Sequence, residues 1–187
     1  DDGFIGSGET GRTTAHLVNA LDDRYAEIEK VHGEPVSRIA AESHTSAIDF
    51  VERVIREENL DCDFKRTDGY LFLHPSDEVK TLIDEHHATH RAGIQTELIN
   101  NVPGITSEKG PCLRFPDQAR FHPMKYLKGL TECIIRNGGQ IFTETKATAF
   151  ENDGVGANGF FIKAQNIVVA TNSPVNDRVT MHTKQFP

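Results

Sequence analysis

The hydrophobic period changes near residue 60, and this change constrains the fold more than any other feature of the sequence. Between Gly33 and about Asn59, apolar residues recur at steps of three and four, which predicts one long helix with a buried stripe. Pro35 favours a helix start there, because proline is tolerated in the first turn. After residue 60, short aliphatic and aromatic runs bounded by turn residues predict strands. The chain is therefore expected to be α+β, and the stripe consists of Val36, Ile39, Ala40, Ala47, Phe50, Val51, Val54 and Ile55.

Shorter patterns predict the remaining elements. Residues 100–121 carry three prolines and two glycines and are expected to form an irregular connection. Helices are expected over 13–21, from Asp22 to about Val31, from Ser76 to about Ala92, where Gly93 stops the helix, and from His122-Pro123 to about 136. Strands are expected over 70–73, 96–99, 140–143, 145–150, 159–163 and 165–171.

Composition narrows the classes of function. The net charge of -8 argues against a general nucleic-acid binder, because attraction to phosphate needs clustered Lys and Arg. No apolar run approaches the ~20 residues that a membrane helix needs. Cys62, Cys112 and Cys133 are far apart and odd in number, so they predict reduced thiols rather than a disulfide framework or a zinc site. We therefore expect a cytoplasmic protein that binds neither nucleic acid nor a membrane.

The ends of the sequence suggest an internal fragment of a larger protein. The chain begins Asp1-Asp2, with neither an initiator Met nor a signal peptide, and ends at Gln185-Phe186-Pro187 without a helical or charged tail.

The segment from Gly6 to Leu17, GSGETGRTTAHL, has the residues of an anion site. Glycines at 6, 8 and 11 let the backbone approach a ligand, and a helix starting near Thr13 would present free N–H groups to it. Arg12 adds a permanent charge with bidentate donors. Hydroxyls come from Ser7, Thr10, Thr13 and Thr14. The alternative is a surface turn with an ordinary helix cap.

A second segment, NIVVATNSP, reads as a buried strand with a polar end. The continuous apolar run Ile167–Ala170 is typical of a strand covered on both faces. Ligands of open α/β sheets gather beyond the carboxyl ends of such strands, where Thr171, Asn172 and Ser173 follow. Taken alone, the pattern favours a buried strand with a polar turn over a ligand site.

Five motifs in this order resemble the FAD-dependent oxidoreductases of the D-amino-acid oxidase superfamily. The resemblance covers nearly the whole chain, and the pair GETGRTTAHL and VVATNSPVNDR is most similar to members with a C-terminal Rieske domain. The motifs are Gly6-Ser7-Gly8-Glu9-Thr10-Gly11-Arg12, Gly69-Tyr70-Leu71, Phe121-His122-Pro123, Gly138-Gly139-Gln140-Ile141 and Val168-Val169-Ala170-Thr171.

The resemblance implies an enzyme that oxidises an amine, amino acid or similar small substrate by hydride transfer to FAD. The loop from Thr10 would wrap the flavin pyrophosphate and direct His16 toward the ring, while Ala147 would meet the adenine. The end of the last strand would meet the phosphate and ribose. No catalytic residue is nominated, because the cofactor carries the redox chemistry. The implied cofactor residues are Ser7, Thr10, Gly11, Arg12, Thr13, Thr14, Ala15, His16, Ala147, Ala170, Thr171 and Asn172.

The resemblance also implies an organisation. The chain would be a fragment of a FAD/NAD(P)-binding, Rossmann-like oxidoreductase with part of its mixed-sheet substrate domain. Residues 1–60 would hold the cofactor loop and helices, 61–121 part of the substrate domain, and 122–187 the return to the FAD-binding domain. Because the glycine-rich G-x-G-x-x-G motif is missing, the isolated fragment is expected to be inactive. A Rieske 2Fe–2S cluster would lie in a domain beyond this chain.

Two other hypotheses remain open at this stage. One is a non-catalytic binding module that inherited the flavoprotein shape. The other is a metal site built on His86 and His90, which share a helix face but lack further ligands, so no metal is expected. His122 is expected to cap a helix or to pack at its start rather than to act in catalysis. The predicted edge strand over 165–171 would favour pairing with a second copy.

Overall fold

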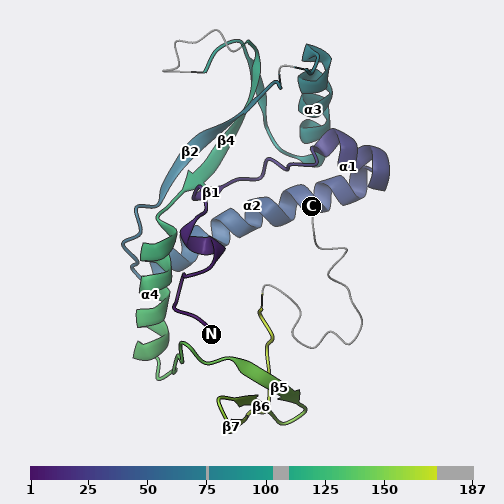
Figure 1. Cartoon of the computed structure of the whole chain (residues 1–187). Helices are drawn as coiled ribbons and strands as arrows, with labels where there is room; N and C mark the ends of the chain where they lie inside the picture. The colour runs from purple at the N-terminus through teal and green to yellow at the C-terminus, as the bar shows by residue number, and fades with distance from the viewer. Residues whose placement is uncertain (75, 103–109, 172–187) are drawn as a thin grey trace.

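The computed structural model describes residues 1–74, 76–102 and 110–171, and it confirms the α+β class (Figure 1). Each helix predicted from about Asp22 onward is present, with bounds within a few residues of those expected. The helices are α1 (Tyr25–His32), α2 (Glu34–Glu57), α3 (Val79–Ala92) and α4 (Pro123–Arg136), preceded by a short 3-10 turn, η1 (Glu9–Gly11). The strands are β1 (His16–Leu17), β2 (Lys65–Phe72), β3 (Glu97–Ile99), β4 (Cys112–Arg120), β5 (Ala147–Glu151), β6 (Gly154–Ala157) and β7 (Phe160–Lys163).

Strand β4 organises the first sheet, so the prediction of an irregular connection over 100–121 was wrong. β4 pairs antiparallel with β2 along one edge and with β1 and β3 along the other. Pro116 falls between the stretch paired with β3 and the stretch paired with β1. The missing proline N–H therefore breaks no ladder there, which is how a strand tolerates proline.

A β-bulge kinks β4 at this proline. The register places Thr67 opposite Gln118 but Gly69 opposite Phe115, so β4 holds one more residue than β2 between these pairs. Asp117 takes the left-handed conformation with φ 57°. A Cβ added at Gly69 would lie 3.1 Å from Gln118 Cγ, so glycine lets the glutamine side chain cross the strand.

The core forms where α1, α2 and α3 meet the first sheet. Glu85 of α3 is 1% exposed and accepts hydrogen bonds from the N–H groups of Tyr25 and Ala26, which caps α1. Burial, and then the Glu85 carboxylate, raise the pKa of Tyr25, whose hydroxyl donates to the carbonyl of Asn19 at 2.6 Å. The core consists of Tyr25, Ala41, Leu82, Ala88, Ala92, Ile94, Leu113 and Phe115.

Helix α2 does not bury the stripe that its sequence predicts. Its buried residues are Ser37, Ala41 and Ile48, whereas Ile39 is 64% and Phe50 54% exposed. The elements that meet α2, chiefly α1 and α3, contact the neighbouring face of the helix. The 3.6-residue period therefore predicted the helix correctly, but it predicted the wrong face of the helix as the buried one.

The second sheet is a small antiparallel meander in the order β5-β6-β7. Residues 140–143 form no strand, contrary to the prediction, although the N-terminal segment hydrogen-bonds beside them, from Asp1 to the carbonyl of Phe142 and from Glu144 to Gly3. Residues 165–171 are also not a strand, because no described strand pairs with them. Val168 is 88% exposed instead of covered on both faces.

The helix predicted over 13–21 is absent. Ala15 has φ 65°, which interrupts a right-handed helix, and His16–Leu17 instead pair with Arg120 and Ala119 at the edge of β4. Pairing with β4 thus overrides the local pattern. Among the described helices, none combines the length and the apolar character required to span a membrane.

Candidate functional site

The predicted loop lines a hollow of about 480 Å³ at the start of α4. We call it the loop hollow. Six of the sequence-predicted residues line it, namely Thr10, Gly11, Thr13, Thr14, Ala15 and His16. The opposite wall comes from far along the chain: Asp63, Arg120, Phe121, His122, Pro123 and Met124.

Short contacts fix this loop against α4. The N–H of Phe121 donates to the carbonyl of Ala15 at 3.3 Å. Gly6 has φ 76°, a conformation that favours glycine, and its Cα faces the end of the Met124 side chain at the start of α4. His122 caps α4, as predicted, by accepting from the N–H of Lys125.

Hydrogen-bond donors at the loop hollow remain available. Among the described residues, the backbone N–H groups of Thr13 and Thr14 donate to no protein acceptor. The Arg120 guanidinium makes no ion pair or hydrogen bond within the described part of the chain, although its charge helps to lower the pKa of Asp63. The pKa of Asp63 is held below its usual value, chiefly by the hydrogen bond from Lys125, whose Nζ lies 2.8 Å from Asp63 Oδ2. The hollow therefore offers donors for an anion, but from loop amides and Arg120 rather than from a helix terminus.

A second hollow of about 520 Å³ lies between the segment that leads into α1 and the face of β2. We call it the sheet hollow. Its wall is mostly apolar, with Val18, Leu21, Tyr70, Leu71 and Phe115, and it carries the polar groups of Asp22, Arg24, Asp68 and Gln118. His16 lines both hollows, so they share a wall at β1.

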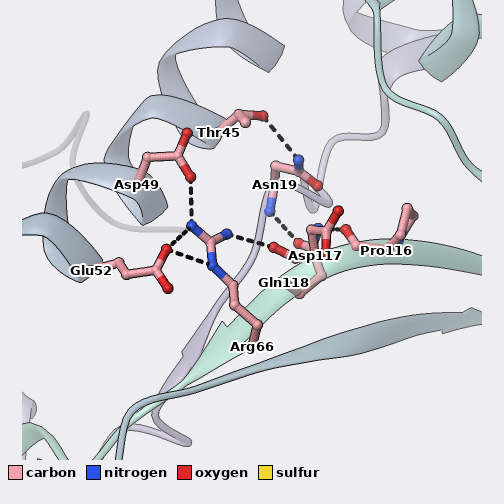
Figure 2. Close-up of polar contacts among 8 residues, drawn as sticks. All are labelled: Asn19, Thr45, Asp49, Glu52, Arg66, Pro116, Asp117 and Gln118. Atoms are coloured by element: carbon pink, nitrogen blue, oxygen red, sulfur yellow. Dashed lines mark hydrogen bonds and ion pairs between the residues drawn. The ribbon is translucent and has the colours of Figure 1, made fainter.

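A polar network holds the bulge of β4, and with it Gln118, in place (Figure 2). Gln118 is 1% exposed; its Oε1 accepts from the N–H of Asn19 at 2.7 Å, and its Nε2 donates to the carbonyl of Pro116. The Asn19 side chain donates to Thr45 of α2. Hydrogen bonds therefore connect Gln118, in the wall of the sheet hollow, to α2 through Asn19.

Arg66 of β2 reinforces the same junction. Its guanidinium donates to Glu52 and Asp49 of α2 and to the carbonyl of Asp117 in the bulge (Figure 2). Because the Arg66 side chain is 27% exposed, these interactions are partly shielded from water. One side chain thus joins helix, strand and bulge.

The structure separates the other sequence-predicted residues from the loop hollow. Ser7 and Arg12 do not line it, and Arg12 instead pairs with Glu9 at the surface, 74% exposed. Ala147 lies in β5, Ala170 and Thr171 lie in the exposed segment after β7, and Asn172 lies outside the described residues.

Sequence reasoning missed the far wall of the loop hollow and most of the sheet hollow. Arg120, Asp63 and Arg24 belong to no motif in the sequence. The one available signal was the strand β4 itself, since a strand over 112–120 would have placed Arg120 beside the His122-Pro123 helix start. The prolines within 100–121 obscured it.

The histidines of α3 have structural partners. His86 Nδ1 lies 2.9 Å from Thr96 Oγ1, and His90 Nε2 lies 3.0 Å from the Thr96 carbonyl oxygen. Burial, followed by His90 and His87, lowers the pKa of His86. In the described part of the chain, no group of three or more His, Cys, Asp or Glu side chains is placed to hold a metal ion.

Comparison with known families identifies the class of this protein as a flavin-dependent oxidoreductase. The sequence profile of the family described as FAD dependent oxidoreductase (DAO) matches residues 1–186. The chain therefore belongs to this family, which confirms the resemblance predicted from its motifs.

Individual relatives agree with this assignment. The chain is 31% identical over 175 residues to the "Putative Rieske 2Fe-2S iron-sulfur protein YhfW" of Bacillus subtilis, covering 91% of this chain and 34% of that protein. It is 24% identical to the gamma-glutamylputrescine oxidoreductase of Escherichia coli, covering 94% and 43%. Its fold is similar to glycine oxidase from Geobacillus kaustophilus, with a TM-score of 0.72 and 13% identity over 91% and 47% of the two chains. The chain thus spans about a third to a half of these relatives.

The residues of the loop hollow suit the cofactor that defines the family. FAD carries an anionic pyrophosphate and ring carbonyls, all of which accept hydrogen bonds. The two amides, the threonine hydroxyls and the Arg120 guanidinium supply donors. The volume falls within the ~300–1,000 Å³ typical of ligand pockets.

Proposed function

We propose that this chain forms part of an enzyme that oxidises an amine, an amino acid or a similar small donor by hydride transfer to FAD. The observation that carries the proposal is the pair of hollows with His16 in their common wall. Donor groups gather on one side and apolar surface on the other, as expected for a cofactor beside a small organic substrate. The names of the relatives, which include L-proline dehydrogenase and glycine oxidase, support the same chemistry.

Each hollow has its own part in this proposal. FAD would supply the hydride acceptor, while the chain binds and orients. The amides of Thr13 and Thr14 and the guanidinium of Arg120 would hold the cofactor at the loop hollow. The sheet hollow would receive the substrate, and its apolar wall would limit the access of water. His16, which lines both hollows, would position one ligand against the other.

The assignments that extend beyond the hollows are also proposals. The adenine would meet Ala147, and the phosphate and ribose would meet Ala170, Thr171 and Asn172. The chain would then divide into the cofactor loop and helices (1–60), part of the substrate domain (61–121) and the return to the FAD-binding domain (122–187). A parent enzyme would be active, and this chain in isolation would be inactive. The likeness to a protein named for a Rieske cluster supports a 2Fe–2S centre as the electron acceptor of FAD. The parent enzyme would be cytoplasmic.

The test is the visible spectrum of the complete gene product that contains this chain. Purified protein should show oxidised-flavin absorption that bleaches when a mixture of amines and amino acids is added without oxygen. A correctly folded, colourless product that takes up no added FAD would contradict the proposal and favour a non-catalytic binding module.

A matched pair of variants tests the placement of the cofactor. Arg120→Gln should weaken FAD binding about tenfold, the size of a lost charge-assisted hydrogen bond. Arg12→Gln, which removes an exposed guanidinium already paired with Glu9, should change it less than about twofold. The reverse order would show that Arg12, the arginine nominated by the sequence, binds the cofactor.

A further inference from the structure

The side chain of Gln118 continues the pairing of β1 with β4 at the point where the backbone ladder stops. The ladder ends at Leu17, which lies opposite Ala119. Beyond this pair β4 enters its bulge at Pro116, which has no N–H to offer. The segment after Leu17 is held instead by the N–H of Asn19, which donates to Gln118 Oε1 at 2.7 Å. A side-chain amide therefore takes the place of a backbone carbonyl at this edge of the sheet.

The Gln118 side chain is fixed at both ends and along its length. Its Nε2 donates to the carbonyl of Pro116 at 2.8 Å, and the residue as a whole is 1% exposed. Its Cγ passes close to Gly69 of β2, where an added Cβ would lie only 3.1 Å away. The amide cannot turn aside without leaving the buried N–H of Asn19 unpaired, which is costly.

Asn19 carries this anchor into the wall of the sheet hollow. Its neighbours Val18 and Ala20 line the hollow on the side of the segment before α1, and Gln118 lines it on the side of the sheet. Asn19 is also fixed to the helices, because its side chain donates to α2 and its carbonyl accepts from the hydroxyl of Tyr25. The hydrogen bond between Asn19 and Gln118 thus joins one wall of the hollow to the other (Figure 2).

We propose that Gln118 is a positioning residue that sets the gap between residues 18–21 and the sheet, and with it the girth of the molecule that the sheet hollow accepts. Gln118 acts through Asn19 and not through the reacting atoms. Because the wall is mostly apolar, discrimination between ligands of equal charge depends on their shape. The identity of the ligand as an amine rests on the proposed function, whereas the role of Gln118 rests on its own hydrogen bonds.

The experiment compares hexylamine with cyclohexylamine, which have the same charge and equal numbers of carbon atoms but differ in girth. Calorimetry on the complete gene product measures both affinities, and the wild-type protein should bind hexylamine at least about tenfold more tightly. Gln118→Met keeps the length of the side chain and removes both hydrogen bonds. It should reduce this ratio of affinities to less than about threefold, because residues 18–21 are no longer held. Gln140→Met, the same change at an exposed position outside the hollow, is the matched control and should keep the wild-type ratio.

Gln118→Glu separates positioning from a general loss of stability. The introduced carboxyl, when neutral, can accept from Asn19 and donate to the carbonyl of Pro116 as the amide does, whereas its ionised form can only accept. Burial raises the pKa of such a carboxyl. The variant should therefore show the wild-type ratio at about pH 5 and lose it toward about pH 8, a range in which both amines stay protonated. The wild-type protein and Gln140→Met should show no such loss.

The possible outcomes decide between positioning and a purely structural role. An unchanged ratio in Gln118→Met, or a ratio in Gln118→Glu that follows the wild-type protein at every pH, would assign Gln118 to the fold alone and overturn the proposal. A wild-type protein that binds neither amine, or that does not distinguish them, would overturn it as well. If Gln118→Met does not fold, the pH profile of Gln118→Glu decides. A protein without flavin absorption whose ratio still changes in these variants contradicts the proposed function and retains the role of Gln118.

Discussion

Two regions of the molecule differ in how much apolar side-chain surface they bury. The first, built from β1–β4 with α1–α3, encloses Tyr25, Leu82, Leu113 and Phe115, each at most 1% exposed. The second, built from α4 with β5–β7, buries little besides Cys133 and Ala157 and leaves Phe160 76% exposed. Figure 1 shows the second region at the opposite end of the molecule from α3. Both regions have regular secondary structure, so hydrogen bonding does not distinguish them; apolar burial does.

The two hollows differ in where they lie relative to these regions. The sheet hollow lies inside the first region, where α2, the bulge of β4 and Gln118 hold its wall. The loop hollow lies at the seam, between the loop of the first region and the start of α4. We therefore expect the sheet hollow to depend on the core, and the loop hollow to depend on how the two regions meet.

The largest expected effect tests the contrast directly. Leu82→Ala, in the core of the first region, should lower the free energy of unfolding by about 2–5 kcal/mol, through lost burial and the cavity that remains. Ile162→Ala in β7, where the side chain is 49% exposed, should change it by no more than about 0.5 kcal/mol. Urea unfolding of the two variants measures both. Comparable losses would show that the second region is as well packed as the first.

A smaller effect is expected at the junction of α2 with β2 and β4. Arg66→Gln removes the donors to Glu52, Asp49 and the carbonyl of Asp117, and should cost about 1–2 kcal/mol because the group is partly buried. Lys30→Gln breaks an exposed pair with Glu27 and should cost less than about 0.5 kcal/mol. Urea midpoints at fixed pH give the comparison, and equal costs would mean that Arg66 contributes only as a surface charge.

The sequence predicted the fold where a single element carries its own signal. The proline at the start of α2 and the glycine after α3 marked helix ends that the structure confirms. The predictions failed where strand pairing decides whether a segment forms a strand. β4 is a strand because β1, β2 and β3 flank it in spite of Pro116, and 165–171 lacks a partner among the described strands. Local periodicity carries no information about partners distant in sequence.

About half of the residues that line the loop hollow could be predicted, again because local patterns carry no information about distant partners. Six residues of the motif from Gly6 to Leu17 line the loop hollow, because they lie within seven positions of one another and the same loop brings them together. Arg120 reaches the hollow only through the pairing of β4 with β1, and Arg24 owes its place to a strained turn before α1. The helix dipole expected at Thr13 is replaced by unpaired amides, which a helical pattern could not reveal.

The smallest expected effect is a pH dependence within the first region. Burial, then His90 and His87, lowers the pKa of His86, so the unfolded chain binds this proton more tightly than the folded protein does. The stabilisation is complete above the ordinary pKa of about 6.5 and is lost as the pH falls through it toward the folded value. The free energy of unfolding of the wild-type protein should therefore fall more between about pH 8 and pH 5 than that of His86→Gln, whose side chain can still reach Thr96. Identical curves for the two proteins would mean that folding leaves the protonation of His86 unchanged.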